Sequence, residues 1–369
     1  MKILQVYKNY YPVLGGIENN MRMLCAEFAR LGHEVTALVA NGGPGTVREV
    51  IEGVQVIRAG ALGTAARTPL SPHLFWEMAR LRPDVTHLHF PYPVGELAYL
   101  LAGRGRHTAI TYHSDIVKQR ALLRGYEPFL RWLLSRAERI IATSPNYIRS
   151  SPYLSRVAAK CVVVPSGVDG ERFRRRDPAA VARLRQLYGE PLVLFVGLFR
   201  YYKGVEYLIA AMRDVPARLV LVGAGPLEAE LRAQVQREGV GEKVHFAGAV
   251  SDAELPGYYH ACDVFVLPAS HRSEALGLAQ IEAMFCEKPV ICTELGTGTS
   301  YANLDGVTGL VVPPRDPAAM AAALNRLLGD DQLRRRLGHA ASERAWQEFS
   351  KEVMFQRVDA LYRQLVEDS

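Results

Sequence analysis

The chain has 369 residues, of which 49% are hydrophobic and 22% charged, a balance that excludes a disordered or fibrous protein. This length exceeds what one ordinary hydrophobic core organises, so we expect two domains of about 150 to 200 residues. The net charge of +6 is uneven, because residues 1–170 hold 20 Lys and Arg against 12 Asp and Glu, whereas the remainder holds 24 against 26. The basic half indicates an anionic partner, such as a membrane surface, a phospholipid-like acceptor or nucleic acid; scattered surface charge is the alternative.

Neither a membrane span nor an exported chain is expected. No stretch approaches about 18 uninterrupted apolar residues, and the start, MKILQVYKNYYP, has too short an apolar run for a signal peptide. The cysteines are odd in number and lack paired metal spacing, so we predict reduced, mostly buried thiols of a cytosolic protein: Cys25, Cys161, Cys262, Cys286 and Cys292.

Strand and helix patterns alternate along the first half of the chain. KILQVY (residues 2–7) is a β-like run, and residues 17–33 show apolar side chains at helical spacing with a stop at Gly32. The further strands predicted in this half are EVTALVA (34–40), VQVIRA (54–59), VTHLHF (85–90), HTAITYH (107–113), RIIATS (139–144) and CVVVPSGVD (161–169).

The second half repeats the alternation after a turn-rich, charged segment, PSGVDGERFRRRD (165–177), which is typical of a linker. Its predicted strands are PLVLFVG (191–197), ARLVLVGAG (217–225), VHFAGA (244–249), DVFVLP (263–268), PVICTE (289–294) and GLVVPP (309–314), with helices between them. Such alternation predicts an α/β protein with two parallel sheets, each covered by helices on both faces. Ligands are expected at the carboxyl ends of the strands, in a cleft between the two sheets.

The stretch SEALGLAQIEAM (273–284) places two glutamates on either side of a turn made mostly of residues with small side chains. Glu274 follows a strand on a loop, Gly277 precedes a helix, and Glu282 lies about one and a half turns, or ~8 Å, into that helix. Free N–H groups around Gly277 and Leu278 favour an anion, whereas carboxylates accept hydrogen bonds from hydroxyl groups. The spacing suits a diphosphate between two sugars; local capping or ion pairing of both glutamates is the alternative.

Two other loops have weaker patterns. In VGLFRYYKGVEYLI (196–209), Lys203 precedes a helix and could contact phosphate oxygens with Arg200 beside it, although the order of a Walker loop is missing. In YYPVLGGIENN (10–20), Gly15 and Gly16 form a bare turn before a helix, without the full dinucleotide-binding pattern. A solvated basic loop and a helix-packing turn are the respective alternatives.

Together with PSGVD (165–169), GAGPLEAELR (223–232) and GVTGLVVPPRD (306–316), these motifs resemble the family-four retaining glycosyltransferases, over about residues 1 to 350. The resemblance implies the GT-B fold, in which two Rossmann-like domains with parallel sheets face a central cleft. We expect an acceptor-binding domain at 1–170, on which a helix at about 352–369 packs back, and a nucleotide-sugar-binding domain at 171–351.

The resemblance also implies roles for single residues. Glu274 would contact hydroxyl groups of the donor sugar, Glu282 the ribose, and Lys203 the diphosphate. The complete set of donor-binding residues that we predict is Gly15, Gly16, Arg200, Lys203, Gly277, Leu278 and Glu282. Leu198 stands where the family usually has an arginine, so Arg200 is the candidate replacement, and Ser166 stands where the family usually has asparagine.

Histidines follow or occupy two of the predicted strands. His113 lies after a strand, and the resemblance places it near the donor sugar and the reacting phosphate, where it could donate to an oxygen or orient the acceptor. A packed loop histidine is the alternative, and Asp115 is a less certain contact. His87 and His89 share one strand face but are too few for a zinc site, so we expect them to line the acceptor side or to cap the strand.

Residues 118–140 combine arginines and Lys118 with Leu, Phe and Trp, which suits a basic amphipathic surface on an anionic membrane. The alternative is a helix whose apolar stripe is core and whose arginines are merely solvated.

These observations predict a retaining hexosyltransferase with Glu274 and His113 as catalytic residues, Glu274 positioning the sugar instead of attacking it. It would move a hexose, with mannose favoured, from a nucleotide sugar to a glycan or lipid-linked acceptor in cell-surface polysaccharide or glycolipid synthesis. GDP-mannose is the favoured donor and UDP-sugars come next; no Asp-x-Asp motif is present, so we expect no metal and no other cofactor. We expect no nucleic-acid partner, and a cytoplasmic location, peripheral on the inner face of the cell membrane. The alternatives are a non-catalytic nucleotide-sugar or lipid-binding module and a GT-B phosphorylase or epimerase.

Overall fold

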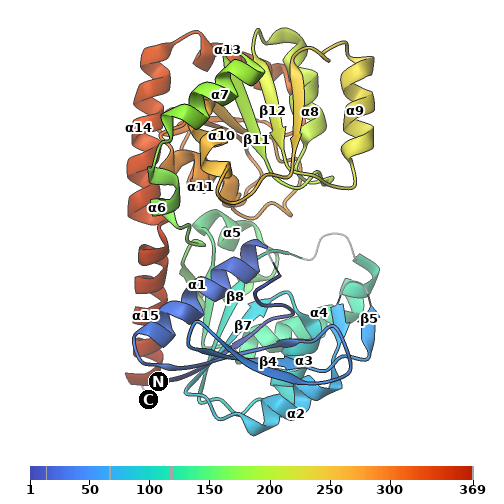
Figure 1. Cartoon of the computed structure of the whole chain (residues 1–369). Helices are drawn as coiled ribbons and strands as arrows, with labels where there is room; N and C mark the ends of the chain where they lie inside the picture. Colours follow the sequence, from blue (N-terminus) through green and yellow to red (C-terminus); the bar gives the residue numbers. More distant parts are fainter. Residues whose placement is uncertain (14, 66–67, 116–119, 368–369) are drawn as a thin grey trace. The chain divides into compact units, whose positions relative to one another are not determined.

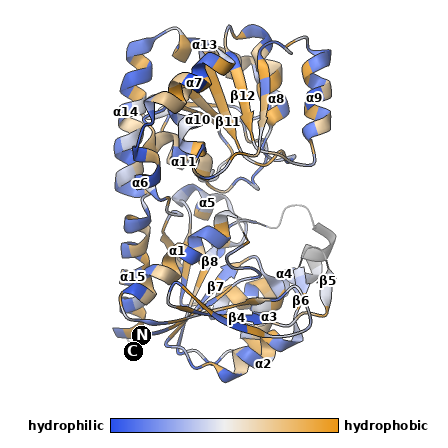
Figure 2. Cartoon of the chain, in the orientation of Figure 1, coloured by the Kyte–Doolittle hydropathy of each residue, from blue (hydrophilic) through white to orange (hydrophobic). Residues whose placement is uncertain are grey.

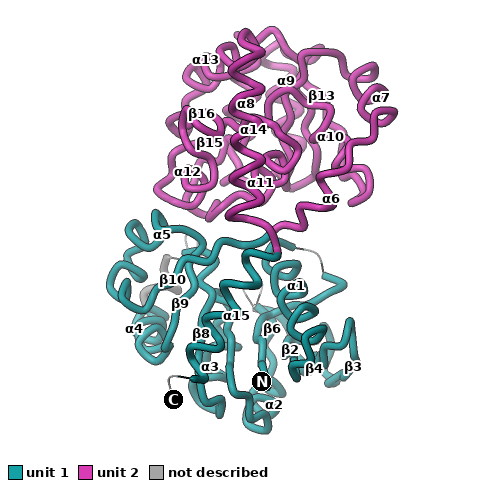
Figure 3. The backbone as a smooth tube through the Cα atoms, turned by 90° about the vertical axis from the view of Figure 1, so that its left-hand side faces the viewer, with its two compact units in different colours: residues 1–167, 352–369 teal, residues 168–351 magenta. Residues whose placement is uncertain are grey.

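The computed structural model describes residues 1–13, 15–65, 68–115 and 120–367 (Figure 1). Its contacts divide the chain into two compact units (Figure 3). Unit 1 consists of residues 1–167 and 352–369, and unit 2 of residues 168–351. The last helix therefore belongs, apart from its first residue, to the unit formed by the beginning of the chain.

Unit 1 is built on an eight-stranded sheet in the order β10-β9-β8-β7-β1-β2-β4-β3. All neighbours pair in parallel except the edge strand β3, which is antiparallel to β4. The strands are β1 (Lys2–Val6), β2 (Glu34–Ala40), β3 (Val47–Ile51), β4 (Val54–Ala59), β7 (Val85–Phe90), β8 (His107–Tyr112), β9 (Arg139–Ala142) and β10 (Cys161–Val163). A separate antiparallel hairpin joins β5 (Gly63–Ala65) to β6 (Thr68–Leu70).

The helices of unit 1 include one from the far end of the sequence. They are α1 (Gly16–Arg30), α2 (Pro72–Arg80), α3 (Pro93–Ala102), α4 (Arg120–Arg136), α5 (Pro145–Ser150), the 3-10 helix Leu154–Lys160 and α15 (Lys351–Glu367). Helix α15 runs beside α1 (Figure 1), where Phe28 contacts both Phe355 and Tyr362 with ring centroids 4.8 and 5.1 Å apart. Aromatic packing of this kind accounts for the return of the chain's end to unit 1.

Unit 2 contains a six-stranded, wholly parallel sheet in the order β13-β12-β11-β14-β15-β16. The strands are β11 (Leu192–Val196), β12 (Arg218–Val222), β13 (Val244–Gly248), β14 (Val264–Leu267), β15 (Val290–Thr293) and β16 (Gly309–Val312). The helices are α6 (Gly170–Arg174), α7 (Pro178–Tyr188), α8 (Val205–Ala211), α9 (Glu228–Arg237), α10 (Leu255–Ala261), α11 (Leu278–Phe285), α12 (Thr299–Ala302), α13 (Pro317–Leu328) and α14 (Asp331–Glu348), with a 3-10 turn at Met212–Asp214. This order reverses direction between β11 and β14, which is the place where doubly wound sheets bind ligands.

The strands of unit 2 are apolar along nearly their whole length because helices cover both faces of the sheet. All four residues of β14 are completely buried. In Figure 2 the strands are coloured hydrophobic, while the surrounding helices alternate hydrophobic and hydrophilic sides. The sequence prediction of parallel sheets wound with helices is confirmed for both units.

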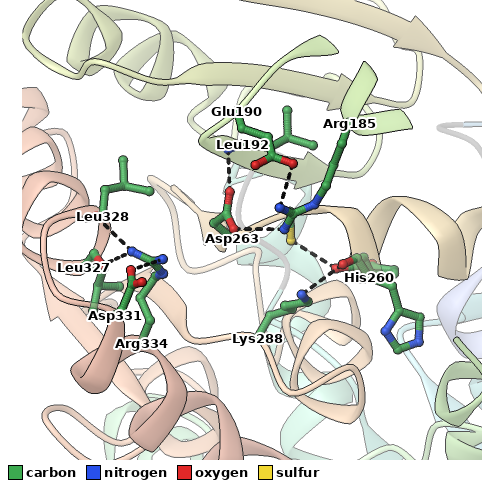
Figure 4. Close-up of polar contacts among 12 residues, drawn as sticks. Arg185, Glu190, Leu192, His260, Asp263, Lys288, Leu327, Leu328, Asp331 and Arg334 are labelled. Atoms are coloured by element: carbon green, nitrogen blue, oxygen red, sulfur yellow. Dashed lines mark hydrogen bonds and ion pairs between the residues drawn. The ribbon is translucent and has the colours of Figure 1, made fainter. Parts of the chain in front are cut away.

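Charged residues fix the amino ends of β11 and β14 to one another (Figure 4). Asp263 accepts a hydrogen bond from the backbone N–H of Leu192 at 2.8 Å, and Arg185 pairs with both Asp263 and Glu190 at 3.0 and 2.8 Å. In the same figure, Arg334 donates to the last carbonyl groups of α13. Because β11 and β14 are held in register at one end, the loops at their other ends begin side by side.

Several local predictions differ from the structure. The helix expected at 17–33 begins at Gly16 and ends at Arg30, because Gly32 takes a left-handed conformation with φ +83°. The edge strand β3 and the β5–β6 hairpin were not predicted, since Val47–Ile51 is mostly exposed and lacks a long apolar run. Among the described residues, no helix combines the length and the apolar character that crossing a membrane would require.

Candidate functional site

The loops after β11 and β14 are joined by hydrogen bonds. The backbone N–H of Ser270 donates to the carbonyl oxygen of Tyr202 at 2.9 Å, and the hydroxyl groups of Tyr201 and Ser273 lie 3.1 Å apart. Neither tyrosine was predicted to have this role, although the paired aromatic residues before Lys203 were visible in the sequence. These contacts bring the loop of Lys203 against the loop of Glu274.

Lys203 and Glu274 form a buried ion pair, with Nζ of the lysine 2.7 Å from Oε2 of the glutamate. Only 13% and 9% of their side-chain surfaces are exposed. Burial opposes the charge of Lys203, but the charge and hydrogen bond of Glu274, with smaller contributions from Tyr202 and Glu282, outweigh burial and raise the pKa of Lys203. The lysine is therefore charged at neutral pH, which is the state needed to bind phosphate.

The start of α11 presents unpaired backbone N–H groups. Gly277 caps this helix with φ +79°, and a Cβ atom there would lie 2.4 Å from Cδ2 of Leu267. In the described part of the chain, the N–H groups of Gly277 and Leu278 have no hydrogen-bond acceptor. Such N–H groups, together with the positive end of the helix dipole, stabilise an anion.

Glu282, in the second turn of α11, is held by a tyrosine from α10. The hydroxyl group of Tyr259 donates to Oε2 of Glu282 at 2.6 Å. Burial raises the pKa of Glu282, while the hydrogen bond from Tyr259 acts in the opposite direction. Tyr259 is itself completely buried, so it fixes one carboxylate oxygen of Glu282 in place.

Two glycine turns approach each other at the carboxyl end of this sheet. A Cβ atom on Gly223 would lie 2.1 Å from the carbonyl oxygen of Gly197, and both residues have positive φ, +130° and +153°. The predicted close turn in GAGPLEAEL is therefore needed where the loops after β11 and β12 meet. Arg200 and Leu198 on the first of these loops are exposed, and a role of Arg200 in diphosphate binding stays a prediction.

In unit 1, Gly15 and Gly16 lie at the start of α1, as predicted. A Cβ atom on Gly15 would lie 2.3 Å from Oε2 of Glu18, so the glycine leaves room for this buried carboxylate. Asn9 donates to Oε1 of Glu18 at 3.3 Å. The helix start thus already carries a negative side chain, and donor binding by Gly15 and Gly16 stays a prediction.

The histidines of unit 1 gather within and just beyond the sheet. His113 follows β8 and is 8% exposed, and its Nε2 lies 3.0 Å from Nδ1 of His89. His87 and His89 lie within β7 and are at most 1% exposed, so neither caps the strand, and a place on the acceptor side stays a prediction. Asp115 accepts hydrogen bonds from Tyr112 at 2.9 Å and Ser151 at 2.8 Å.

The basic segment predicted at 118–140 contains α4. Leu130, Leu133 and Leu134 of this helix are buried, so part of its apolar stripe packs in the core, whereas Trp132 is 46% exposed. Residues 116–119, which include Lys118, lie outside the described part of the chain.

Two family models and several whole-chain relatives match this sequence. "Glycosyltransferase Family 4" matches residues 14–172, and "Glycosyl transferases group 1" matches residues 182–344. The O-antigen chain mannosyltransferase C of Escherichia coli is 35% identical over 370 residues, covering 100% of this chain and 99% of that protein. The chain is a family-four glycosyltransferase. The D-rhamnosyltransferase WbpZ of Pseudomonas aeruginosa is 37% identical over 353 residues, covering 95% of this glycosyltransferase and 92% of that enzyme.

Solved structures show the same fold. Sucrose-phosphate synthase from Thermosynechococcus elongatus superimposes on this glycosyltransferase with a TM-score of 0.82 and 27% identity, covering 100% of both chains. Anabaena HepE in complex with UDP gives a TM-score of 0.79 at 20% identity, covering 99% of this chain and 100% of that chain. The predictions of the family, of the GT-B class and of a hexosyltransferase in polysaccharide synthesis are confirmed.

Further residues of this glycosyltransferase form hydrogen bonds to the candidate site residues or their loops, although no sequence motif indicates them. Tyr259 belongs to one of the helices predicted between the strands, to which no role was assigned. Gln280 of α11 donates to the carbonyl oxygens of Leu276 and Thr299 at 2.5 and 3.2 Å. Thr297 donates to the carbonyl oxygen of Glu274 at 2.8 Å. A single sequence gives no signal for such supporting bonds, because they depend on which loops meet.

Proposed function

We propose that this glycosyltransferase transfers mannose from GDP-mannose, with retention of the anomeric configuration, to a glycan or lipid-linked acceptor. Unit 2 would bind the donor and unit 1 the acceptor. Whole-length similarity to an O-antigen mannosyltransferase supports the choice of sugar, and the complex of HepE with UDP supports a nucleotide-sugar donor. The observation that carries the proposal is the buried Lys203–Glu274 pair beside the unpaired N–H groups of α11.

The donor site follows from the chemistry of these groups. The diphosphate would bind the ammonium group of Lys203 and the N–H groups of Gly277 and Leu278, with Arg200 as a further contact. Glu282, one of whose oxygens is held by Tyr259, would accept a hydrogen bond from a ribose hydroxyl with the other. Glu274 would accept bonds from hydroxyl groups of the mannose, on the opposite side of the diphosphate.

The transfer step would proceed on one face of the sugar. The bond between the anomeric carbon and the phosphate oxygen breaks as the acceptor oxygen forms a bond to the same carbon. The departing phosphate takes the proton of the acceptor hydroxyl, so Glu274 positions the sugar and forms no covalent intermediate. Lys203 and the start of α11 would stabilise the negative charge that develops on the leaving diphosphate.

We also infer that no metal ion is required. The sequence has no Asp-x-Asp motif, and Lys203 already supplies a positive charge at the site. Transfer in the presence of EDTA should match transfer with added Mg²⁺ or Mn²⁺. A rate that depends on either ion would contradict this part of the proposal.

The decisive experiment compares donor binding with transfer in matched variants. Glu274→Gln should lower kcat by about 100-fold or more, because it removes a hydroxyl acceptor at the reacting sugar, while GDP-mannose still raises the melting temperature. Glu230, exposed on α9, provides the control, since Glu230→Gln should leave both quantities unchanged. Thermal-shift screening with GDP-, UDP- and dTDP-sugars identifies the donor, and a preference for UDP-sugars would refute the choice of GDP-mannose.

Product analysis separates the alternative functions. Formation of an α-linked product from the α-linked donor supports retention, and inversion would contradict it. Release of a sugar phosphate that depends on inorganic phosphate would indicate a phosphorylase, and an altered sugar in the recovered nucleotide an epimerase. Binding of donor without transfer to any lipid-linked acceptor would indicate a binding module.

We further propose a cytoplasmic enzyme that contacts an anionic membrane through α2, α3 and α4 of unit 1, with no nucleic-acid partner. Trp76, Leu97, Leu101 and Trp132 are 39–65% exposed on these helices, and the guanidinium group of Arg80 lies 5.7 Å from the Trp76 ring centroid. Exposed Trp and Leu beside arginine are typical of surfaces that bind anionic lipid.

Vesicle sedimentation tests this contact. The protein should sediment with vesicles containing phosphatidylglycerol but not with phosphatidylcholine alone, and high salt should weaken binding. The double variant Trp76→Ser with Leu101→Ser should lose binding, whereas Leu187→Ser, at an equally exposed position of unit 2, should not. Equal binding by both variants would refute the assigned surface.

A further inference from the structure

Basic residues gather at the amino edge of the unit 1 sheet, where its strands begin. Strands β7, β8, β9 and β10 pair in parallel in this order, so the segments that lead into them lie side by side. Ligands of a parallel sheet bind at the opposite, carboxyl edge, so the transfer reaction gives this edge no task. The connecting segments, with the helix and strand residues that flank them, contain Asp84 and Glu138 as acidic residues and Arg80, Arg82, Arg104, Arg106, Arg136, Arg139 and Lys160 as basic ones.

A cavity of about 450 Å³ opens at this edge, at the end of α4. It is lined by residues 135–139, which connect α4 to β9, by Lys160 before β10, and by Leu365 of the C-terminal helix α15. All of these residues belong to unit 1, so the cavity is complete within that unit. Its volume falls in the range of about 300 to 1,000 Å³ that is usual for pockets holding small molecules.

Three side chains of the cavity carry positive charge without an acidic partner. Among the residues that the structure describes, Arg136, Arg139 and Lys160 form no ion pair. Glu138 also lines the cavity, but its carboxylate already has partners in β8: Oε2 lies 3.0 Å from Nδ1 of His107, and Oε1 accepts the backbone N–H of the next residue at 3.1 Å. The three cations therefore remain available to an external anion.

Lys160 offsets the unfavourable effect that the end of a helix has on an anion. The last carbonyl groups of α4 carry a partial negative charge. Nζ of Lys160 donates to the carbonyl oxygens of Ser135 and Ala137 at 2.6 and 2.8 Å, so these carbonyl groups are already satisfied. An ammonium group has three N–H donors, and one is left for a ligand. The two arginines add planar sets of donors, which match the oxygens of a phosphate group.

The cavity also has an apolar wall, and an exposed aromatic ring belongs to the same helix. Leu365 and Ala137 are 6% and 1% exposed. Trp132 precedes Arg136 by four residues, so their side chains share one face of α4, and Trp132 is 46% exposed. Tryptophan is enriched at the level of lipid headgroups. Inorganic phosphate would contact the cations alone, whereas a lipid would also contact the apolar groups.

We propose that this cavity binds the phosphate group of an anionic lipid headgroup, held by Arg136, Arg139 and Lys160. The choice of a lipid over inorganic phosphate rests on the membrane contact proposed above for α2, α3 and α4. The cavity adds to that contact a single headgroup at a defined place. Three unpaired cations disfavour a zwitterionic headgroup, because its ammonium group would lie close to them.

Calorimetry on the full-length protein with dihexanoyl lipids, below their micelle concentrations, measures the headgroup contact without a bilayer. Dihexanoyl phosphatidylglycerol should bind one site per chain, at least about tenfold more tightly than dihexanoyl phosphatidylcholine or inorganic phosphate. Equal affinity for the phosphatidylcholine would refute selection by charge. Equal or tighter binding of inorganic phosphate would refute a lipid as the source of the phosphate group, and no binding of the phosphatidylglycerol would refute the site.

Two double variants of equal charge locate the binding. Arg136→Gln with Arg139→Gln should weaken the affinity for dihexanoyl phosphatidylglycerol at least about 20-fold, because two charge-assisted contacts are lost. Arg104 and Arg106 are exposed at the same edge but do not line the cavity, so Arg104→Gln with Arg106→Gln should weaken it less than about threefold. Equal weakening in both would indicate general attraction by the basic edge and would refute the cavity.

A single variant covers the case in which the first double variant does not fold. Arg136 is exposed, so Arg136→Gln should keep the melting temperature of the parent. It should still weaken the affinity for dihexanoyl phosphatidylglycerol about fivefold or more. An unchanged affinity in this variant would overturn the assignment of the site.

Vesicle sedimentation relates the cavity to the bilayer. The cavity double variant should lose most of its binding to phosphatidylglycerol vesicles, whereas the Arg104 and Arg106 double variant should keep it. Full binding by the cavity variant would refute a headgroup at this site. If the parent protein does not sediment but binds dihexanoyl phosphatidylglycerol through the two arginines, the cavity is supported and the membrane contact of α2, α3 and α4 is wrong.

Discussion

The buried carboxyl group of Glu96 should make the stability of unit 1 fall as the pH rises. Glu96 is 1% exposed at the start of α3, where it accepts from the backbone N–H of Tyr92 at 2.6 Å and from the hydroxyl group of Tyr126 on α4. Burial raises the pKa of Glu96 to about 7, and the two hydrogen bonds only partly offset this effect. The folded state therefore holds the proton more tightly than the unfolded state.

The sign of the effect follows from this difference. Because the folded pKa lies above the unfolded one, the stabilising contribution is complete below about pH 4.5 and is lost as the pH rises through about 7. Between pH 5.5 and 8.5 the expected loss is about 2 kcal/mol. Gln in place of Glu96 resembles the protonated carboxyl group at every pH. The free energy of unfolding of Glu96→Gln relative to the parent should thus increase by about 2 kcal/mol over this range.

Urea unfolding can be followed in unit 1 alone. The tryptophans are Trp76, Trp132 and Trp346, of which only the last belongs to unit 2, so a Trp346→Phe background reports on unit 1. Glu127, the residue after Tyr126 on α4, forms an exposed ion pair with Arg131, and Glu127→Gln should change stability by less than about 1 kcal/mol at either pH.

A Glu96→Gln difference that stays constant between pH 5.5 and 8.5 would refute a raised pKa for Glu96. A difference that decreases with pH would mean that the carboxylate is stabilised in the folded state. Either result would remove desolvation as the dominant effect at this site.

Three further substitutions test the donor site and its framework. Lys203→Met should lower kcat about 100-fold or more in a single-turnover transfer assay, because the leaving diphosphate loses its buried cation; a loss below tenfold would contradict that role. Tyr259→Phe should raise the KM for the donor about tenfold with a smaller change in kcat, because it removes the hydrogen bond that holds the carboxylate of Glu282. An unchanged KM would show that the Tyr259–Glu282 bond is dispensable. Gly223→Ala should destabilise unit 2 by more than about 2 kcal/mol, as measured by Trp346 fluorescence during unfolding. Gly239 also has a positive φ but faces open space, so Gly239→Ala should cost only about 1 kcal/mol. Equal losses in the two variants would refute the steric argument.

The alternation of strands and helices could be predicted from the sequence because parallel strands buried on both faces form continuous apolar runs. β14 and β11 were found in this way, and the loops that follow them were therefore predicted to lie at a ligand-binding edge of the sheet. The exposed edge strand β3 has no such run. It pairs with β4 through a two-residue turn, Glu52–Gly53, which lacks the Asn-Gly or Asp-Gly sequence that usually indicates a hairpin. Exposed strands are the elements that hydrophobic patterns miss.

The partners of the predicted site residues could not be found in the same way. Lys203 and Glu274 are 71 positions apart, and they meet because β14 pairs with β11 while β12 and β13 extend the other side of the sheet. The hydrogen bonds of His89 with Gln5 and with His113 likewise depend on β1 pairing with β7 and β7 with β8. Spacing along a sequence identifies the candidate side chains, whereas strand order decides which of them touch.

Both units bury polar side chains, but unit 2 buries a charged pair and unit 1 buries uncharged histidine rings. In unit 2, Glu274 offsets the cost of burying Lys203, so the ammonium group keeps its charge before any diphosphate binds. In unit 1, the histidines satisfy one another's donors and acceptors, so they stay buried without any charge. An anion that binds the ammonium group of Lys203 must therefore share it with Glu274. Unit 2 thus buries a cation by pairing it with a carboxylate, whereas unit 1 buries its polar rings by keeping them uncharged and hydrogen-bonded to one another.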